Sequence, residues 1–329
     1  MPSPHMQPAG AESGHAAAAA HANAAIERGS SSFASASRLF DPATRESALM
    51  LYAWCRHCDD VIDGQVDGHG RSHADRAEGL ERLAQLREAT LRAWRGDPPD
   101  IPAFVCLSEV VARHDIPQTL LLEHLAGFEM DVRGEHYRTL SDTLLYCHRV
   151  AGVVGLMMAR IMGVRDAETL GHACDLGLGF QLTNIARDIV EDAAIGRVYL
   201  PEVWLEDAGI EAQDLAHPRH RKTLAVLATR LVDTAECYYD SAVTGIAHLP
   251  LRSAWSVATA RDVYRAIGRM VKARGALAWD ARVRTSTAQK LWFAARGAGV
   301  AVGARAAWSL EPSRLQWRVA VKGPLWVLL

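Results

Sequence analysis

Two acidic stripes on apolar helices constrain this chain more than any other feature of its sequence. Within residues 177–192, Gln181, Asn184, Asp188 and Asp192 recur at intervals of three or four positions. A helix therefore places all four side chains on one stripe of its surface. The residues between them are mostly apolar, so we expect this helix to be largely buried and the stripe to face a cleft.

A second acidic stripe lies upstream, in residues 52–63. Asp59 and Asp63 are one helical turn apart, and Arg56 and Tyr52 continue the same face toward the N-terminus. Each acidic pair therefore has an arginine close by in the sequence. We expect the two helices to face each other across a cavity.

Carboxylates held this close together require a reason. On a solvated helix, like charges four residues apart cost only a few tenths of a kcal/mol. At about 6 Å in a partly buried cleft of effective dielectric about 20, the repulsion approaches ~3 kcal/mol. A divalent cation between the oxygens would offset that cost, and Mg²⁺ commonly bridges one or two carboxylates to phosphate. Two solvated acidic faces are the alternative, but the Asn, Gln and Arg beside the carboxylates favour a metal site.

The rest of the chain predicts helices and no strand. Asp41 followed by Pro42 predicts a helix N-terminus, Ser141 is expected to cap a strongly apolar helix, and Gly96-Asp97-Pro98-Pro99 predicts a stop. The predicted helices span residues 42–63, 73–95, 101–114, 117–133, 141–162, 166–192, 219–245, 251–274 and 288–307. We therefore expect an all-α, single-domain protein.

Three parts of the chain differ in composition. Residues 1–28 are rich in Ala, His, Ser and Gly and lack a signal-peptide core, so we predict a disordered tail there. Residues 29–310 form the predicted domain. Residues 311–329 form a C-terminal tail whose tryptophans, basic residues and aliphatics have two interpretations, peripheral contact with a bilayer or packing against the core.

Composition excludes several classes of partner and site. The formal net charge of −2 gives no electrostatic case for nucleic acid. Six scattered cysteines form no disulfide pattern, which is typical of a reducing cytoplasm, so we expect a cytoplasmic protein. The apolar run at residues 150–159 is too short to span a membrane. The glycines at residues 297–303 have neither the spacing nor the preceding strand of a nucleotide-binding loop.

Five separated segments together resemble the squalene/phytoene synthase family, in particular its bacterial phytoene synthases. The resemblance extends from about residue 30 to about residue 284, and the five segments agree with the family in order and spacing. These segments are residues 32–37, 52–63, 146–155, 177–192 and 196–201.

The resemblance implies an isoprenoid-synthase type of helical bundle around a central apolar cavity. It also implies a Mg²⁺-dependent transferase of carotenoid biosynthesis, with Mn²⁺ as the alternative metal and no nicotinamide cofactor. Two molecules of geranylgeranyl diphosphate would condense head to head, through prephytoene diphosphate, to phytoene. The expected associations are with other carotenoid-pathway enzymes and, peripherally, with the inner face of the membrane.

The resemblance also assigns roles to individual residues. The metal ligands it implies are Asp59, Asp63, Asn184, Asp188 and Asp192. The catalytic residues it implies are Asp59, Asp63, Asp188, Asp192, Tyr146 and Tyr264. The substrate-binding residues it implies are Ser32, Phe33, Tyr52, Arg56, Gln181, Asn184, Arg187, Arg197 and Tyr199.

Three other functions compete with this interpretation. The same scaffold could join two farnesyl diphosphates to a C30 product of the diapophytoene or squalene type, because cavity depth sets chain length. A single-substrate terpene cyclase would not need a second complete acidic pair. A non-enzymatic helical protein that binds a metal or a lipid could carry acidic stripes, but it would not need arginines beside both pairs.

Overall fold

The computed structural model describes residues 9–29, 31–64 and 76–310, and these residues form helices without any strand. The predicted fold class is therefore confirmed. The long helices are α1 (Ala9–Gly29), α3 (Pro42–Asp63), α4 (Arg76–Trp94), α5 (Pro102–His114), α6 (Gln118–Arg133), α9 (Ala167–Ala193), α11 (Arg221–Ile246), α12 (Leu251–Arg274) and α13 (Thr287–Leu310). The short ones are α2 (Ser31–Ser37), α7 (Leu140–Cys147), α8 (Val153–Ile161) and α10 (Glu202–Ala208).

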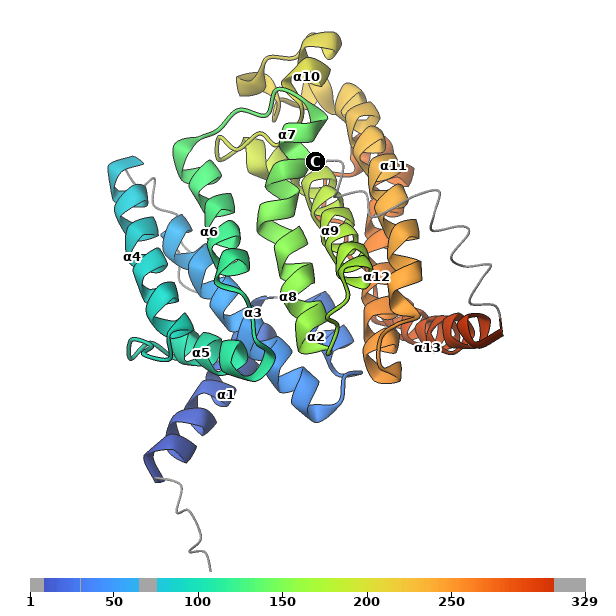
Figure 1. The fold of residues 1–329 in the computed structure, drawn as a ribbon. Coiled ribbons are helices and arrows are strands. Elements are labelled where there is room, and N and C mark those ends of the chain that lie inside the picture. The colour runs from blue at the N-terminus through green and yellow to red at the C-terminus, as the bar shows by residue number, and fades with distance from the viewer. Residues whose placement is uncertain (1–8, 30, 65–75, 311–329) are drawn as a thin grey trace, which may run out of the picture.

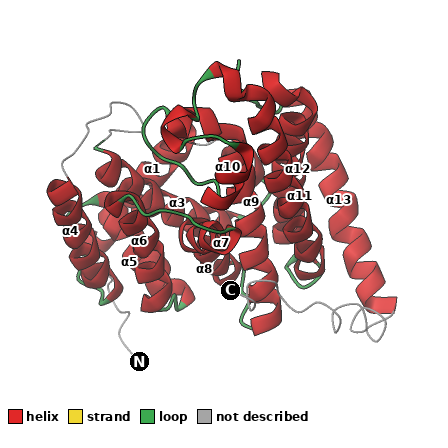
Figure 2. Cartoon of the chain, turned by 90° about the horizontal axis from the view of Figure 1, so that it is seen from above, coloured by secondary structure: helices red, strands yellow, loops and turns green. Residues whose placement is uncertain are grey.

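Helices α8 and α9 lie in the middle of the bundle. Helices α3 to α6 lie on one side of them, and α11, α12 and α13 lie on the other (Figure 1). The view from above shows the same order, with α4 at one edge and α13 at the opposite edge (Figure 2). Helix α9 makes its most extensive contact with α11. The second acidic stripe is therefore carried by a central helix, and the first by α3.

Helix α3 begins and ends where the sequence predicts. The Asp41 carboxylate accepts a hydrogen bond from the Thr44 amide at 3.0 Å, and Pro42 occupies the first turn. At the other end, Gly64 takes a left-handed conformation with φ of 61° and closes the helix. Both ends of the helix that carries Asp59 and Asp63 are thus fixed by local chemistry.

The apolar helix predicted from Ser141 to Met162 differs in two ways from that expectation. Its cap is Thr139, because the Asp142 carboxylate accepts from the Thr139 amide at 2.7 Å in a capping box. The helix is also interrupted by a π-helical turn at His148–Gly152, between α7 and α8. A π turn widens the helix locally, and here it forms part of the wall of the central cavity.

The segment Leu140–Ile161 is long and apolar enough to cross a membrane by length and composition. In the bundle, however, it packs against α6 and α9. A Cβ at Gly155 would overlap the carbonyl oxygen of Ala173, and a Cβ at Gly177 would overlap that of Ala151. Glycine on both helices therefore allows a backbone-to-backbone approach, as expected for a buried core helix.

The structure differs from the predicted disordered tail, residues 1–28, over residues 9–28. The structure has helix α1 there, and it packs against α3 and α5. Ala18, Ala22 and Ile26 recur along one face and are buried in the core. This buried face was not recognised in the sequence, because alanine is only weakly hydrophobic and a stripe of alanines differs little from the residues around it. Residues 1–8 and the predicted C-terminal tail, residues 311–329, lie outside the described part of the chain.

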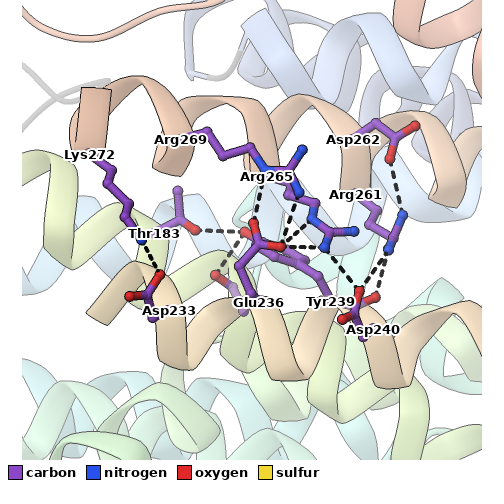
Figure 3. A network of polar contacts seen from close by, with 11 residues as sticks. Thr183, Asp233, Glu236, Tyr239, Asp240, Arg261, Asp262, Arg265, Arg269 and Lys272 are labelled. Carbon is purple, nitrogen blue, oxygen red and sulfur yellow. Dashed lines mark hydrogen bonds and ion pairs between the residues drawn. The ribbon is translucent and has the colours of Figure 1, made fainter. Parts of the chain in front are cut away.

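A network of charges, buried around Arg261 and Asp262, joins α11 and α12 (Figure 3). The Arg261 guanidinium, in a residue only 4% exposed, donates to the Tyr239 carbonyl at 2.7 Å and to Asp262 at 3.1 Å. The Tyr239 hydroxyl donates in turn to the Gly179 carbonyl of α9 at 2.8 Å. The network therefore ties the helix of the second acidic stripe to the two helices behind it.

We expect Arg261→Ala to lower the free energy of unfolding by about 3 kcal/mol, because it leaves the buried Asp262 carboxylate and the Tyr239 carbonyl without this donor. Arg269→Ala is the matched control. Like Arg261, Arg269 links α12 to α11, here through Glu236, but its side chain is 58% exposed. An exposed pair contributes about 1 kcal/mol or less. Urea unfolding measures both variants, and equal losses would contradict the assignment.

Candidate active site

A cavity of about 480 Å³ lies between the two halves of the bundle. Its wall is built from α2, α3, α6, α7, α8, α9, α11 and α12 together with the π-helical turn. Polar side chains, among them Arg56, Asp59, Asn184 and Arg197, gather at one end of the cavity, which we call the polar end. The rest of the cavity wall is mostly apolar. Nine of the fifteen residues that the sequence singled out line this cavity: Phe33, Tyr52, Arg56, Asp59, Tyr146, Gln181, Asn184, Arg197 and Tyr264.

The first acidic stripe is held by two arginines. Arg56 contacts Asp59 at 2.9 Å and Asp60 at 2.6 Å, one turn away in each case. Asp63 is paired with Arg197, which reaches it from the segment after α9. Asp63 does not line the cavity itself, but its partner Arg197 does. The stripe on α3 and the segment after α9 therefore meet at the polar end.

The second stripe divides into a cavity-lining part and an ion-paired part. Gln181 and Asn184 line the cavity, and the Asn184 amide donates to Gln181 Oε1 at 3.3 Å. Farther along α9, Asp188 accepts from Arg187 at 2.8 Å and from Arg282 at 2.9 Å. Arg282, which follows α12, is a partner that the sequence did not indicate.

Two carboxyl groups of the stripes hold their protons unusually strongly. Burial, followed by the negative charge of Asp63, raises the pKa of Asp59 to about 6. Burial, followed by the charge of Asp188, raises the pKa of Asp192 to about 7. These shifts have the sign expected for neighbouring carboxylates in an apolar setting. The site consequently favours positive charge at both stripes.

A further carboxylate outside the two stripes, Asp131 of α6, lines the cavity at the polar end and was not predicted. It accepts hydrogen bonds from the Tyr199 hydroxyl at 2.8 Å and from the Tyr146 hydroxyl at 3.1 Å. The two tyrosine rings are stacked, with centroids 4.5 Å apart. Asp131 thus fixes two residues that the family resemblance selected. One sequence signal could have indicated Asp131: it follows the apolar Phe128 by three positions and therefore lies on the same face of the helix, which is buried at Phe128.

Aromatic rings surround the apolar part below this polar end. Phe33 and Tyr52 stack with centroids 5.5 Å apart, and Phe180 lies 4.3 Å from Tyr264. All four rings line the cavity. Phe180 was not predicted. Ser32 does not line the cavity, although its neighbour Phe33 does.

The donor set fits divalent cations that are shared with a phosphate ligand. Asn184 Oδ1 is buried and has no hydrogen-bond partner among the described residues, so a metal ligand position is available there. Yet no three acidic, His or Cys side chains in the described ranges converge on one point. Asp59, Asp63, Asp188 and Asp192 would each supply one or two oxygens, with phosphate and water completing the shell, which is how Mg²⁺ is commonly bound.

Known proteins are similar to this chain over most of its length. A model of the squalene/phytoene synthase family matches residues 26–289. The chain is 55% identical over 271 residues to a phytoene synthase from Pseudescherichia vulneris, covering 82% of this chain and 88% of the relative. It is 54% identical over 293 residues to a 15-cis-phytoene synthase from Enterobacter agglomerans, covering 89% and 99%.

Solved structures show the same fold. A dehydrosqualene synthase in complex with a ligand is similar with a TM-score of 0.76 at 26% identity, covering 86% of this chain and 96% of that one. A squalene synthase from Alicyclobacillus acidocaldarius is similar with a TM-score of 0.68 at 24% identity, covering 78% and 94%.

We expect Asp131→Asn to change how stability depends on pH. Burial raises the pKa of Asp131 to about 6 from 3.8, although Arg197 and the two tyrosines act against this. The carboxyl therefore contributes its full stability below about pH 4, and this contribution is lost as the pH rises through 6. Between pH 4 and 8 the variant should gain roughly 2 to 3 kcal/mol in unfolding free energy relative to wild type.

Urea unfolding with a chelator present, at several pH values, measures this difference. Asp207→Asn, at an exposed position, is the control and should follow the wild-type profile. A difference between Asp131→Asn and wild type that is constant with pH would contradict the assigned shift.

Proposed function

The chain belongs to the squalene/phytoene synthase family, and on that premise we propose that it is a phytoene synthase, a prenyltransferase of carotenoid biosynthesis. The observation that carries the proposal is the identity of 53–55% with phytoene synthases over more than four fifths of the chain. The proposed reaction joins two geranylgeranyl diphosphates head to head to 15-cis-phytoene, with prephytoene diphosphate as the intermediate and release of both diphosphates.

The polar end of the cavity is the proposed diphosphate site. Arg56 and Arg197 line it, and guanidinium groups bind phosphate oxygens in a bidentate manner. Arg187 lies beside Asp188 on the same side. We assign Asp59, Asp63, Asn184, Asp188 and Asp192 as the residues that hold Mg²⁺, or Mn²⁺ as the alternative. The metal would supply Lewis-acid stabilisation of the negative charge on the departing diphosphate.

The apolar part of the cavity is the proposed site of the allylic cation and of the prenyl chains. Its apolar wall would exclude the water that quenches such a cation. The rings of Phe33, Tyr52, Tyr146 and Tyr264 line this space, and a desolvated ring stabilises a cation by about 1 to 2 kcal/mol. The pair Tyr146 and Tyr199 is oriented by Asp131. Proton loss from the final cation ends the reaction, so we propose no nicotinamide cofactor.

The alternatives are less well supported. A dehydrosqualene synthase shares the fold at 26% identity, far below the identity with phytoene synthases, so the C30 reaction is not favoured. A non-enzymatic acidic helical protein would need neither the apolar cavity nor the arginines beside the acidic stripes. A cytoplasmic location, peripheral contact with the inner face of the membrane and association with other carotenoid-pathway enzymes remain part of the proposal.

The direct test incubates the purified protein with geranylgeranyl diphosphate and, separately, with farnesyl diphosphate. Each reaction is run with Mg²⁺ and with a chelator, without nicotinamide, and the hydrocarbon is identified by mass. We expect a C40 hydrocarbon from the C20 substrate only when Mg²⁺ is present. A C30 product alone would move the proposal to the C30 reaction, and no diphosphate release from folded protein would refute it.

We expect Asp59→Ala and Asp188→Ala to lower kcat by about a thousand-fold or more, because losing a metal ligand removes several kcal/mol of charge stabilisation. Glu191→Gln is the matched control, since Glu191 of α9 also pairs with Arg282 but is half-exposed and outside the cavity. Circular dichroism checks that each variant is folded. Near-normal turnover of either alanine variant would remove that residue from the metal site.

A further inference from the structure

The cavity ends, at the side away from the acidic stripes, in a wall that contains one histidine. His172 lines this end together with Thr169 of the same helix, Met162 after α8 and Leu249 after α11. Along α9, His172 is twelve residues from Asn184, a rise of about 18 Å. The histidine is therefore far from the proposed diphosphate site and cannot take part in ionisation there.

A hydrogen-bond chain fixes the position of the His172 ring. His172 Nδ1 lies 2.8 Å from Ser241 Oγ, and the Ser241 hydroxyl donates to the Asp175 carboxylate. Because that hydroxyl has a single proton, the Nδ1 atom must be the donor to Ser241. Nε2 then carries a lone pair, and it is buried without a hydrogen-bond partner among the described residues.

The ring is also neutral and tightly packed. Burial lowers the pKa of His172, so the uncharged form that an apolar ligand tolerates is the form expected at neutral pH. The backbone of α11 lies against the start of the His172 side chain, since a Cβ at Gly245 would lie 2.7 Å from His172 Cβ and 3.6 Å from Cγ. By contrast, the neighbouring Met162 has a flexible side chain that adapts to its surroundings. His172 is thus the side chain of this wall that is held most firmly in place.

We propose that His172, held by Ser241 and Asp175, is the stop against which the far end of a prenyl chain rests, and that it sets the longest diphosphate substrate the cavity accepts. This inference rests on the proposed function and names its specificity-determining residue. A C20 chain reaches the ring, a C15 chain leaves space before it, and a C25 chain is excluded by it.

The test compares kcat/KM for farnesyl, geranylgeranyl and geranylfarnesyl diphosphates in wild type and in variants. His172→Ala should raise the ratio of the C25 to the C20 value by about 10-fold or more, because it opens space at the end of an apolar pocket. His172→Phe keeps a ring at this place and should still exclude the C25 substrate. Ser241→Ala frees the ring from its anchor and should raise the ratio less than His172→Ala does.

The matched control is another histidine bound to a serine. His114 Nε2 lies 2.9 Å from Ser47 Oγ, and neither residue lines the cavity. His114→Ala should leave the C25 to C20 ratio unchanged. If His172→Ala does not fold, Ser241→Ala and His172→Phe decide the question by the same ratio.

The outcomes separate this inference from the proposed function. If the His172→Ala variant is folded and converts the C20 substrate with the wild-type C25 to C20 ratio, the role of His172 as the stop is overturned. The assignment as a synthase would stay in place. Wild-type protein that converts none of the three diphosphates would overturn both. A rise in the ratio that is as large for His114→Ala would show a general loosening of the bundle, and would also overturn the stop.

Discussion

Repulsion among carboxylates at the polar end of an apolar cavity is the constraint on which the rest of this structure depends. Asp59, Asp63, Asp131 and Asp188 would not remain together in such a setting without opposite charge nearby. Arg56, Arg197, Arg187 and Arg282 supply it, and each comes from a different part of the chain. The pKa values of Asp59 and Asp192 are nevertheless raised, which shows that the arginines do not fully compensate the burial and mutual repulsion of the carboxylates. The fold thus prepares a place where further cations lower the energy.

The helices behind this site keep the cavity in shape. Glycine pairs let α8 and α9 approach backbone to backbone, so the two central helices have little freedom to slide. Tyr239 and Arg261 then bind α9 to α11 and α12 through buried hydrogen bonds. Burying an arginine is costly unless its donors are satisfied. A rigid wall is of value for the proposed chemistry, because a cation in the cavity must meet the same aromatic surfaces in each turnover.

The predictable parts of the fold and the site are those written in local sequence. The ends of α3 follow from Asp41, Pro42 and Gly64, and the stripe on α9 follows from helical spacing. The remaining parts depend on tertiary contacts. Thr139 replaced Ser141 as a cap because Asp142 completes a box with it, and α1 is held by alanines that become a buried face only when α3 and α5 cover them. No local pattern brings Arg282 to Asp188 or Asp131 to two tyrosines.

The two ends of the cavity accommodate titratable side chains in different ways. At the polar end, charged groups are tolerated because arginines surround them and a cation is expected between them. At the far end a titratable group is tolerated because Ser241 and Asp175 fix one neutral form of His172. Motifs describe the first end, since diphosphate chemistry demands particular residue types there. Chain length demands only a wall at a given depth, and many side chains can build a wall. The residue that limits the substrate is therefore found from the cavity, and not from a motif.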